Sequence, residues 1–142
     1  MPPHTYGTFT KALQAGKLEP AYYFLGAENV LKDEATTALL DKVLDPGLRD
    51  FNLDIRSAQQ LEPEDVLSLC TTLPMMADRR VVVVRDVEAW KRKTRGKKAV
   101  LEYLQKPIPE TLLVRVQGAA SEAKADKPDT DLAKHAYTIA FA

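Results

Sequence analysis

Apolar positions along the chain follow helical spacing in some segments and strand-like runs in others. Residues 22–26 (Tyr-Tyr-Phe-Leu-Gly) form an aromatic run of strand length that a glycine closes. Apolar residues then recur at intervals of four through 28–44, which predicts a helix that Asp-Pro-Gly at 45–47 ends. A short helix, capped by Thr8 and ended by Gly16, is expected before the first strand.

The rest of the chain repeats this alternation of strand and helix. Residues 53–56 alternate apolar and polar side chains, as in a half-exposed edge strand. Pro63 lies in the first turn of a predicted helix whose apolar face extends to Leu73. Four successive valines at 81–84 predict a strand covered on both faces, because β-branched residues without alternation are typical of buried parallel strands. The remaining predicted elements are a helix at 97–106, a strand at 112–116, a helix at 130–136 and a strand at 138–141.

Strands separated by helices imply parallel crossovers, so the predicted fold class is α/β, a three-layer sandwich with a five-stranded parallel sheet. The strands near Leu53 and Thr138 are expected at its edges and the valine strand inside. Residues 118–127, rich in alanine and charge, are expected to form a mobile loop. We interpret 1–142 as a single domain, and we expect it to have been cut from a longer protein because the chain stops as its fifth strand ends.

Composition and charge exclude several classes of function and location. Twenty basic and twenty acidic residues give no net charge, so no overall field draws the protein onto nucleic acid or an anionic membrane. The single Cys70 excludes a disulfide framework and fits a reducing compartment. No segment approaches the ~20 apolar residues that span a bilayer. We therefore expect a cytoplasmic protein without membrane contact, metal or cofactor.

The turn after the first strand is similar to a phosphate-binding loop whose essential residues are missing. In the pattern G-x-x-x-x-G-K-[ST], Gly26 and Lys32 match the first glycine and the lysine. Leu31 replaces the second glycine, and Asp33 replaces the hydroxyl residue that binds magnesium. Glu28 adds a negative charge that repels a triphosphate. We therefore expect no nucleotide binding, and Lys32 is interpreted as a solvated surface lysine.

Two other features offer alternative functions. Asp86, at the end of the valine strand, has the position of a phosphoacceptor in a receiver-like domain, although the expected acidic cluster after the first strand is missing. Residues 91–98 contain six basic side chains that could follow a DNA phosphate backbone. A solvated loop and helix start is the favoured interpretation of this basic run, whose charged members are Lys91, Arg92, Lys93, Arg95, Lys97 and Lys98.

Two stretches of sequence resemble a known family. The first is Leu-Glu-Pro-Ala-Tyr-Tyr-Phe-Leu-Gly-Ala-Glu at 18–28, continued by Leu-Lys-Asp-Glu-Ala at 31–35. The second is Leu-Pro-Met-Met-Ala-Asp-Arg-Arg at 73–80, followed by the valine strand and Arg-Asp-Val-Glu at 85–88. Both are similar to delta subunits of bacterial DNA polymerase III clamp loaders, and they occur in the right order. The resemblance runs from about Phe9 to Phe141 and corresponds to the first of the family's three domains.

The resemblance implies a P-loop NTPase-like domain of the AAA+ type that lacks a functional nucleotide site, with strand order 5-1-4-3-2. It implies that the domain binds the sliding clamp, or beta subunit, inserts an apolar pair into a pocket and favours ring opening, while other subunits handle ATP. The implied partners are this clamp, other clamp-loader subunits reached through domains missing here, and DNA indirectly. The chain is then part of the polymerase holoenzyme without being an enzyme itself. The implied clamp contacts are Leu73, Pro74, Met75, Met76 and Ala77, with methionines where family members often have leucine or phenylalanine.

Overall fold

The computed structural model describes residues 4–118 and 129–141. The segment expected to be a mobile loop lies outside these residues, apart from Gly118. The helices and strands in chain order are α1 (Tyr6–Gln14), β1 (Ala21–Leu25), α2 (Asn29–Val43), α3 (Arg49–Asn52), β2 (Leu53–Ser57), the 3-10 helix η1 (Ala58–Gln60), α4 (Asp65–Cys70), β3 (Arg80–Arg85), the 3-10 helix η2 (Val87–Trp90), α5 (Thr94–Gln105), β4 (Thr111–Val116), α7 (Thr130–Ala133) and β5 (Tyr137–Ala140).

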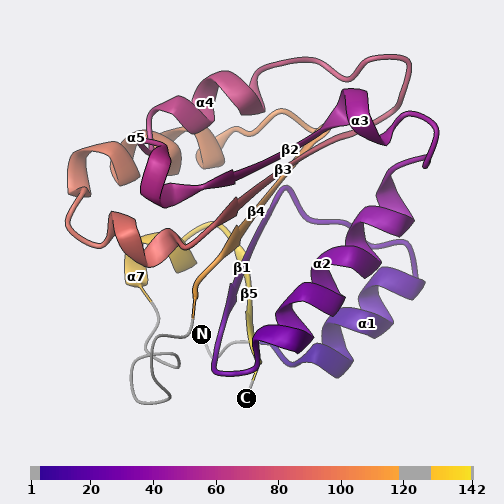
Figure 1. Ribbon diagram of the computed structural model, residues 1–142, viewed down its shortest axis with the longest axis horizontal. Helices are drawn as coiled ribbons and strands as arrows, with labels where there is room; N and C mark the ends of the chain where they lie inside the picture. Colours follow the sequence, from indigo (N-terminus) through magenta and orange to yellow (C-terminus); the bar gives the residue numbers. More distant parts are fainter. Residues whose placement is uncertain (1–3, 119–128, 142) are drawn as a thin grey trace.

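The sheet has five parallel strands in the order β2-β3-β4-β1-β5 (Figure 1). This is the predicted order, with β2 and β5 at the edges and the valine strand inside. All four valines of β3 are fully buried. Because the strands are parallel, every connection that enters a strand lies at one edge of the sheet, and every connection that leaves a strand lies at the opposite edge. We call the first of these the amino edge and the second the carboxyl edge. They are distinct from the edge strands β2 and β5, which lie at the two sides of the sheet.

Helices cover both faces of the sheet and complete the three layers (Figure 1). Side chains alternate along a strand, so Val81 and Val83 pack beneath α1 and α2 against Phe9 and Leu39. Val82 and Val84 point to the other face, where the core is formed with residues of α4, α5 and α7 such as Val66, Val100 and Leu132. The predicted three-layer α/β sandwich is therefore confirmed.

Three boundaries differ from the sequence-based expectation. Thr5 caps α1, accepting a hydrogen bond from the Thr8 backbone N–H at 3.1 Å, so Thr8 is inside the helix. Helix α4 ends at Cys70, and Leu73 is 70% exposed instead of lying on its apolar face. Helix α5 begins at Thr94, so the second half of the basic run lies at the start of this helix and the first half precedes it. These differences lie at helix ends, because side-chain caps and prolines determine where a helix begins or ends more strongly than apolar periodicity does.

The final predicted helix is also shorter than expected. It ends at Ala133 in place of residue 136, and His135 follows with a left-handed φ of 56°. A backbone in that region does not continue a right-handed helix. Among the described helices, none has both the length and the apolar character needed to cross a bilayer.

Candidate functional site

The connection between α4 and β3 presents apolar side chains to solvent at the amino edge of the sheet. We call residues 71–79 the methionine loop. Leu73, Met75 and Met76 are 70%, 57% and 85% exposed, whereas Pro74 and Ala77 are partly buried. Apolar side chains this exposed on a short loop are typical of a binding surface rather than of a core. The structure therefore brings the five predicted contact residues together on one loop, with the three largest of them facing solvent.

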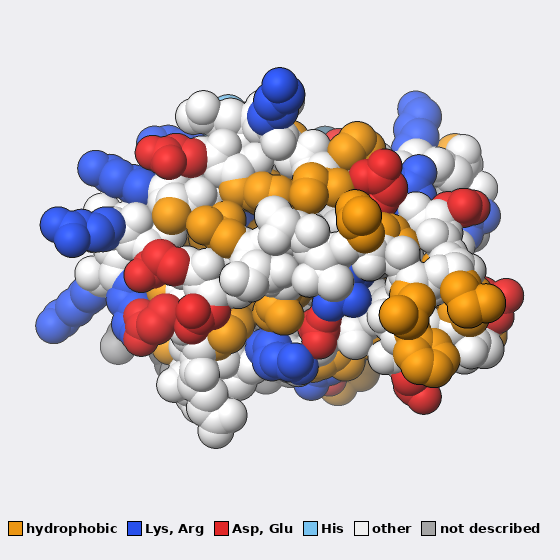
Figure 2. All heavy atoms as spheres, turned by 90° about the horizontal axis from the view of Figure 1, so that it is seen from above, with side chains coloured by type: hydrophobic (Ala, Val, Ile, Leu, Met, Phe, Trp, Pro, Cys, Tyr) orange, Lys and Arg blue, Asp and Glu red, His pale blue; other side chains and the backbone are white. Residues whose placement is uncertain are grey.

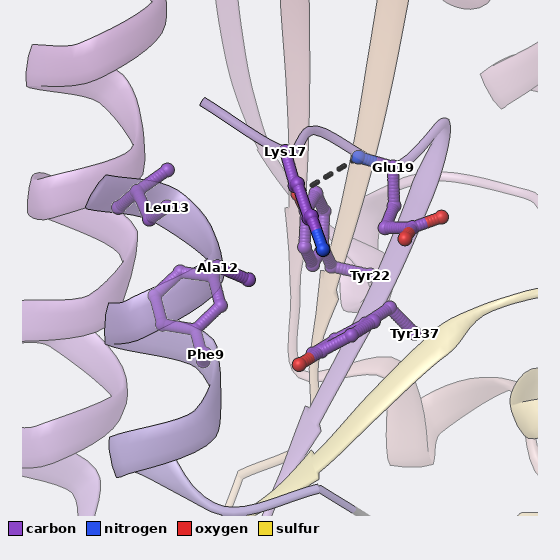
Figure 3. Close-up of a pocket in the computed structure, with 7 residues that line it drawn as sticks. All are labelled: Phe9, Ala12, Leu13, Lys17, Glu19, Tyr22 and Tyr137. Carbon is purple, nitrogen blue, oxygen red and sulfur yellow. Dashed lines mark hydrogen bonds between the residues drawn. The ribbon is translucent and has the colours of Figure 1, made fainter. Parts of the chain in front are cut away.

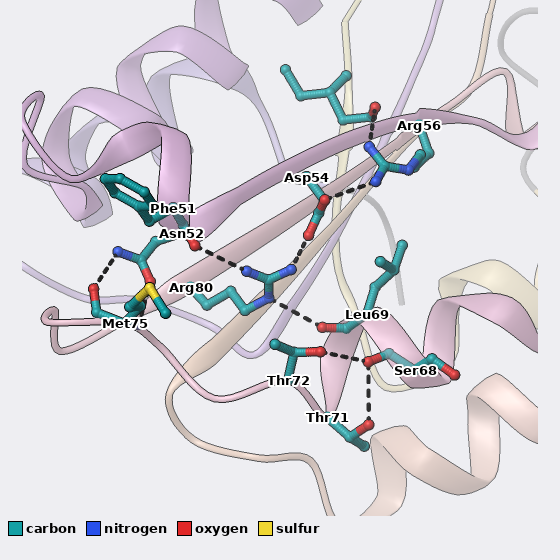
Figure 4. Close-up of polar contacts among 11 residues, drawn as sticks. Phe51, Asn52, Asp54, Arg56, Ser68, Leu69, Thr71, Thr72, Met75 and Arg80 are labelled. Carbon is teal, nitrogen blue, oxygen red and sulfur yellow. Dashed lines mark hydrogen bonds and ion pairs between the residues drawn. The ribbon is translucent and has the colours of Figure 1, made fainter.

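An aromatic residue that sequence analysis missed adjoins this loop. Phe51 lies on α3, is 61% exposed, and immediately precedes Asn52, whose side chain contacts the Met75 backbone. Figure 4 shows Phe51, Asn52 and Met75 on the same side of Arg80. Figure 2 shows hydrophobic side chains gathered at the end of the molecule that carries α3 and the α4–β3 connection. The available signal was an aromatic residue in a polar segment that belonged to neither a predicted helix nor a predicted strand.

The base of the methionine loop is held by a buried arginine. Arg80, the first residue of β3, donates hydrogen bonds to the Leu69 carbonyl at 3.2 Å and to the Phe51 carbonyl at 3.5 Å (Figure 4). Its guanidinium also pairs with the Asp54 carboxylate, which in turn pairs with Arg56 at 2.9 Å. Burial lowers the pKa of Arg80. One side chain thus links the end of α4, the end of α3 and strand β2 directly beneath the loop.

The degenerate phosphate loop lies at the carboxyl edge, away from the methionine loop. Gly26 has a φ of 113°, and a Cβ built on it would lie 2.2 Å from the Phe141 carbonyl oxygen. Only glycine fits this turn, because a side chain would clash with backbone that follows β5. The glycine at position 26 is therefore explained by the close approach of two chain segments, without a phosphate site.

Lys32 is not the solvated lysine that the sequence suggested. Its side chain is buried, and Nζ donates hydrogen bonds to the Gly26 carbonyl at 2.8 Å and the Gln117 carbonyl at 2.6 Å. Burial lowers its pKa, which the charges of Glu88 and Asp33 partly raise again. The ammonium joins the turn after β1 to the end of β4. The interpretation as a surface residue was wrong, because the helical position of Lys32 points the side chain toward the carboxyl ends of the strands.

The surroundings of Lys32 are those of a closed structural contact. The Glu88 carboxylate accepts hydrogen bonds from the Gly118 N–H at 2.9 and 3.0 Å, and burial raises its pKa. Glu28, at the N-cap of α2, and Asp33, within α2, are both exposed. A triphosphate would meet these carboxylates and an ammonium already bonded to two carbonyls.

Calorimetric titration with Mg-ATP is accordingly expected to show no binding heat. Leu31 and Asp33 remove the phosphate cradle and the magnesium hydroxyl, and Lys32 Nζ is held by Gly26 and Gln117. A nucleotide-binding AAA+ domain titrated under the same conditions serves as the positive control. Magnesium-dependent ATP binding in the micromolar range would contradict this prediction.

The described residues do not form an acidic phosphoacceptor cluster around Asp86. It adopts a left-handed φ of 59° at the end of β3, and its carboxylate accepts a hydrogen bond from the Ser57 hydroxyl at 3.1 Å. Within residues 4–118 and 129–141, no three His, Cys, Asp or Glu side chains are placed to hold a metal ion. The described residues therefore add nothing to the receiver-like alternative.

The basic run is divided between structural ion pairs and solvent. Lys97 is buried and pairs with Asp129 at 2.8 Å and Asp131 at 3.5 Å, which ties α5 to α7. Lys93 pairs with Glu62 at 2.6 Å. The solvated interpretation thus fails for Lys97, and the exposed members are Lys91, Arg92, Arg95 and Lys98. A DNA contact of this run stays a prediction.

A small cavity under α1 is not a ligand site. Its volume is about 10 Å³, and Phe9, Leu13, Tyr22 and Tyr137 are among its lining residues (Figure 3). That volume holds roughly one water molecule. The Tyr22 hydroxyl accepts a hydrogen bond from the Glu19 N–H at 2.9 Å, and burial raises the Tyr22 pKa to about 12. The cavity is a packing defect beside a core tyrosine.

Solved structures share this fold. The Bacillus subtilis DNA clamp loader delta protein superposes with a TM-score of 0.80 at 24% identity, covering 96% of this chain and 42% of that one. A DNA polymerase III gamma subunit-related protein from Thermotoga maritima superposes with a TM-score of 0.67 at 12% identity, covering 98% of this chain and 46% of that one. These likenesses define the class of fold, an α/β domain with a parallel five-stranded sheet between layers of helices, which this chain shares with both proteins.

Sequence comparison defines the family within that class. A family model described as DNA polymerase III, delta subunit, matches residues 22–141, so the chain belongs to this family. The chain is 29% identical over 135 residues to DNA polymerase III subunit delta of Bacillus subtilis. The alignment covers 91% of the chain and 39% of that relative, so the chain spans well under half of the relative's length.

Proposed function

We propose that this chain binds a sliding clamp as the clamp-contacting domain of a clamp-loader delta subunit. The observation that carries the proposal is the methionine loop, which exposes Leu73, Met75 and Met76 from a buried, hydrogen-bonded base. Apolar side chains presented in this way fit a hydrophobic pocket on a protein partner. Membership of the delta subunit family makes the ring-shaped beta subunit the partner of choice.

The proposed mechanism is binding without chemistry. Met75 and Met76 enter a pocket at one edge of the clamp, with Leu73 and Phe51 packing around them. Burial of a methionine side chain contributes about 1.5–3 kcal/mol, and its flexible thioether adapts to pockets of irregular shape. Binding of this kind stabilises whichever ring conformation offers the better pocket, so it favours opening if the open ring binds more tightly.

The remaining parts of the proposal follow from the degenerate phosphate loop. Because Lys32 is committed to backbone carbonyls, ATP binding and hydrolysis belong to other subunits of the loader. The alignment covers 39% of the Bacillus subtilis relative, and we propose that the other subunits, and DNA, contact the part of a delta subunit outside the aligned region. We place the assembly in the cytoplasm, where DNA replication takes place in bacteria.

The test is direct binding of the chain to the beta subunit of the same organism, measured by surface plasmon resonance and calorimetry. We expect saturable 1:1 binding per clamp protomer with a dissociation constant in the micromolar range or tighter. A folded chain that shows no binding at clamp concentrations about ten times the expected dissociation constant would contradict the proposal.

The four exposed members of the basic run support weak DNA binding as a second candidate function. If Lys91, Arg92, Arg95 and Lys98 each contact a phosphate, log K should fall against log salt with a slope of about −3.6, because each contact contributes about −0.9. Changing all four to glutamine should abolish this binding. The matched control neutralises four other exposed lysines, Lys11, Lys17, Lys42 and Lys106. Equal loss in both variants would mean that the basic run is not a DNA site.

A further inference from the structure

We infer that Asn52 is a positioning residue for clamp binding, which fixes the Met75 backbone and so presents the methionine pair in its binding conformation. This inference rests on the proposed function. It concerns a residue outside the segment that the sequence singled out, on a different element from the loop that it serves. Asn52 itself touches no solvent, so it acts through Met75 and not by contact with the clamp.

The oxygen and the nitrogen of the Asn52 amide both form hydrogen bonds with the backbone of Met75 in the methionine loop, and we call this pair of hydrogen bonds the grip. Its Oδ1 accepts a hydrogen bond from the Met75 N–H at 2.6 Å, and its Nδ2 donates to the Met75 carbonyl at 2.9 Å. The second proton of Nδ2 goes to the Leu48 carbonyl at 3.1 Å, within the turn that leads into α3. This pairing reproduces what a neighbouring strand would offer to Met75, but it is supplied by one side chain.

The contact with Asn52 lies at the middle of the methionine loop. Backbone hydrogen bonds anchor the two ends, from Thr71 N–H to the Leu67 carbonyl at 3.0 Å and from Arg80 N–H to the Glu110 carbonyl at 2.8 Å. Asn52 adds the central point of attachment. Fixing one residue of a loop before binding reduces the ordering entropy that association would otherwise cost.

The backbone conformation of the residue after Met75 also indicates that the loop is held in one conformation. Met76 has a φ of 57°, in the left-handed region that residues with a side chain rarely adopt. Such a conformation persists where the surrounding structure determines it. With both polar groups of Met75 bound to Asn52, the peptide leading into Met76 is set, and the Met76 side chain is turned outward to 85% exposure.

Only asparagine supplies this combination at the length required. Aspartate at residue 52 keeps the acceptor for the Met75 N–H but places a second carboxylate oxygen against the Met75 and Leu48 carbonyls. Leucine has a similar volume and offers neither group. The pair of variants Asn52→Asp and Asn52→Leu therefore removes the grip in two steps. Thr36→Val is the matched control, because Thr36 is also buried and its hydroxyl bonds the Lys32 carbonyl within α2 at 2.9 Å, far from the loop.

The first readout needs no partner. Amide exchange of Met75, followed by NMR, should show protection in the native chain, loss of protection in Asn52→Leu, and no change in Thr36→Val. Asn52→Asp keeps the acceptor for the Met75 N–H and should lose only part of this protection. The second readout is affinity for the beta subunit. We expect at least a tenfold loss with Asn52→Leu, a smaller loss with Asn52→Asp, and none with the control. The affinity is compared for folded molecules only, at a temperature well below each melting transition.

A merely structural asparagine is separated from a positioning one by a double-mutant cycle with Met76→Ala. If Asn52 acts by presenting the methionines, the double variant loses less binding free energy than the sum of the losses from Asn52→Leu and Met76→Ala. The reason is that Met76→Ala removes the side chain that Asn52 orients. Additive losses, or full affinity in Asn52→Leu, would overturn the inference. If Asn52→Leu does not fold, the cycle is run with Asn52→Asp.

Failure of the proposed function gives a different result. If Met76→Ala binds the clamp as well as the native chain, or the native chain does not bind at all, clamp binding through this loop is wrong and the positioning role falls with it. If Met76→Ala weakens binding while Asn52→Leu and Asn52→Asp do not, the proposed function stands and only the positioning role is overturned.

Discussion

Replacing Met75 and Met76 together by alanine is expected to weaken clamp binding about a hundredfold or more, with little change in melting temperature. Each buried methionine contributes about 1.5–3 kcal/mol to an apolar contact, and every 1.4 kcal/mol is about a tenfold change in affinity. Both side chains are exposed in the free chain, so their loss leaves the core intact. Affinity is measured by surface plasmon resonance and stability by thermal circular dichroism on the same variant.

The chain provides a matched control for this experiment. Val30 is 67% exposed on α2 at the carboxyl edge of the sheet, so Val30→Ala removes an exposed apolar side chain away from the methionine loop. We expect it to bind the clamp like the native chain. Unchanged affinity in a folded methionine variant would remove the pair from the site. A sharply lowered melting temperature would show instead that the pair supports the core, since buried methionine-to-alanine changes cost about 2–5 kcal/mol each.

Arg80→Ala is expected to lower the free energy of unfolding by about 3–5 kcal/mol, the usual effect of removing one partner of a buried ion pair. The side chains of Arg80 and Asp54 are 8% and 16% exposed, so the change leaves a carboxylate and two carbonyls in a largely buried region without their strongest donor. Urea unfolding followed by circular dichroism measures the difference.

Arg56→Ala is the matched control because Arg56 pairs with the same Asp54 from the surface. Its side chain is 48% exposed, and exposed ion pairs contribute at most about 1 kcal/mol. The two arginines therefore separate the effect of burial from that of charge pairing. Similar losses in both variants would show that the buried network around Arg80 contributes no more than a surface contact.

The parallel sheet could be predicted from the sequence because its signals are local. Four valines without alternation indicate cover on both faces, and the alternating pattern at 53–56 indicates an edge. The structure confirms both positions. The strand order required the family resemblance, since periodicity identifies strands but does not arrange them.

Features that depend on distant partners were missed or misjudged. The burial of Lys32 depends on the Gln117 carbonyl, 85 positions further along the chain, which accepts a hydrogen bond from Lys32 Nζ. Leu73 continues the apolar periodicity of α4 but lies beyond its last turn. No local pattern shows that Asn52 reaches Met75, because the spacing of 23 residues follows from the way in which α3 and the methionine loop meet at the amino edge.

The contacts of the turn after β1 have a consequence for protein engineering. Restoring a glycine at position 31 and a threonine at position 33 would recreate the sequence of a phosphate loop, yet the Lys32 ammonium would still be held by the Gly26 and Gln117 carbonyls. The Phe141 carbonyl would also remain within contact distance of Gly26, where the loop has to widen to admit a phosphate. A designer who wished to regain a nucleotide pocket would have to begin at the last strand and at the end of β4, and edit the loop afterwards.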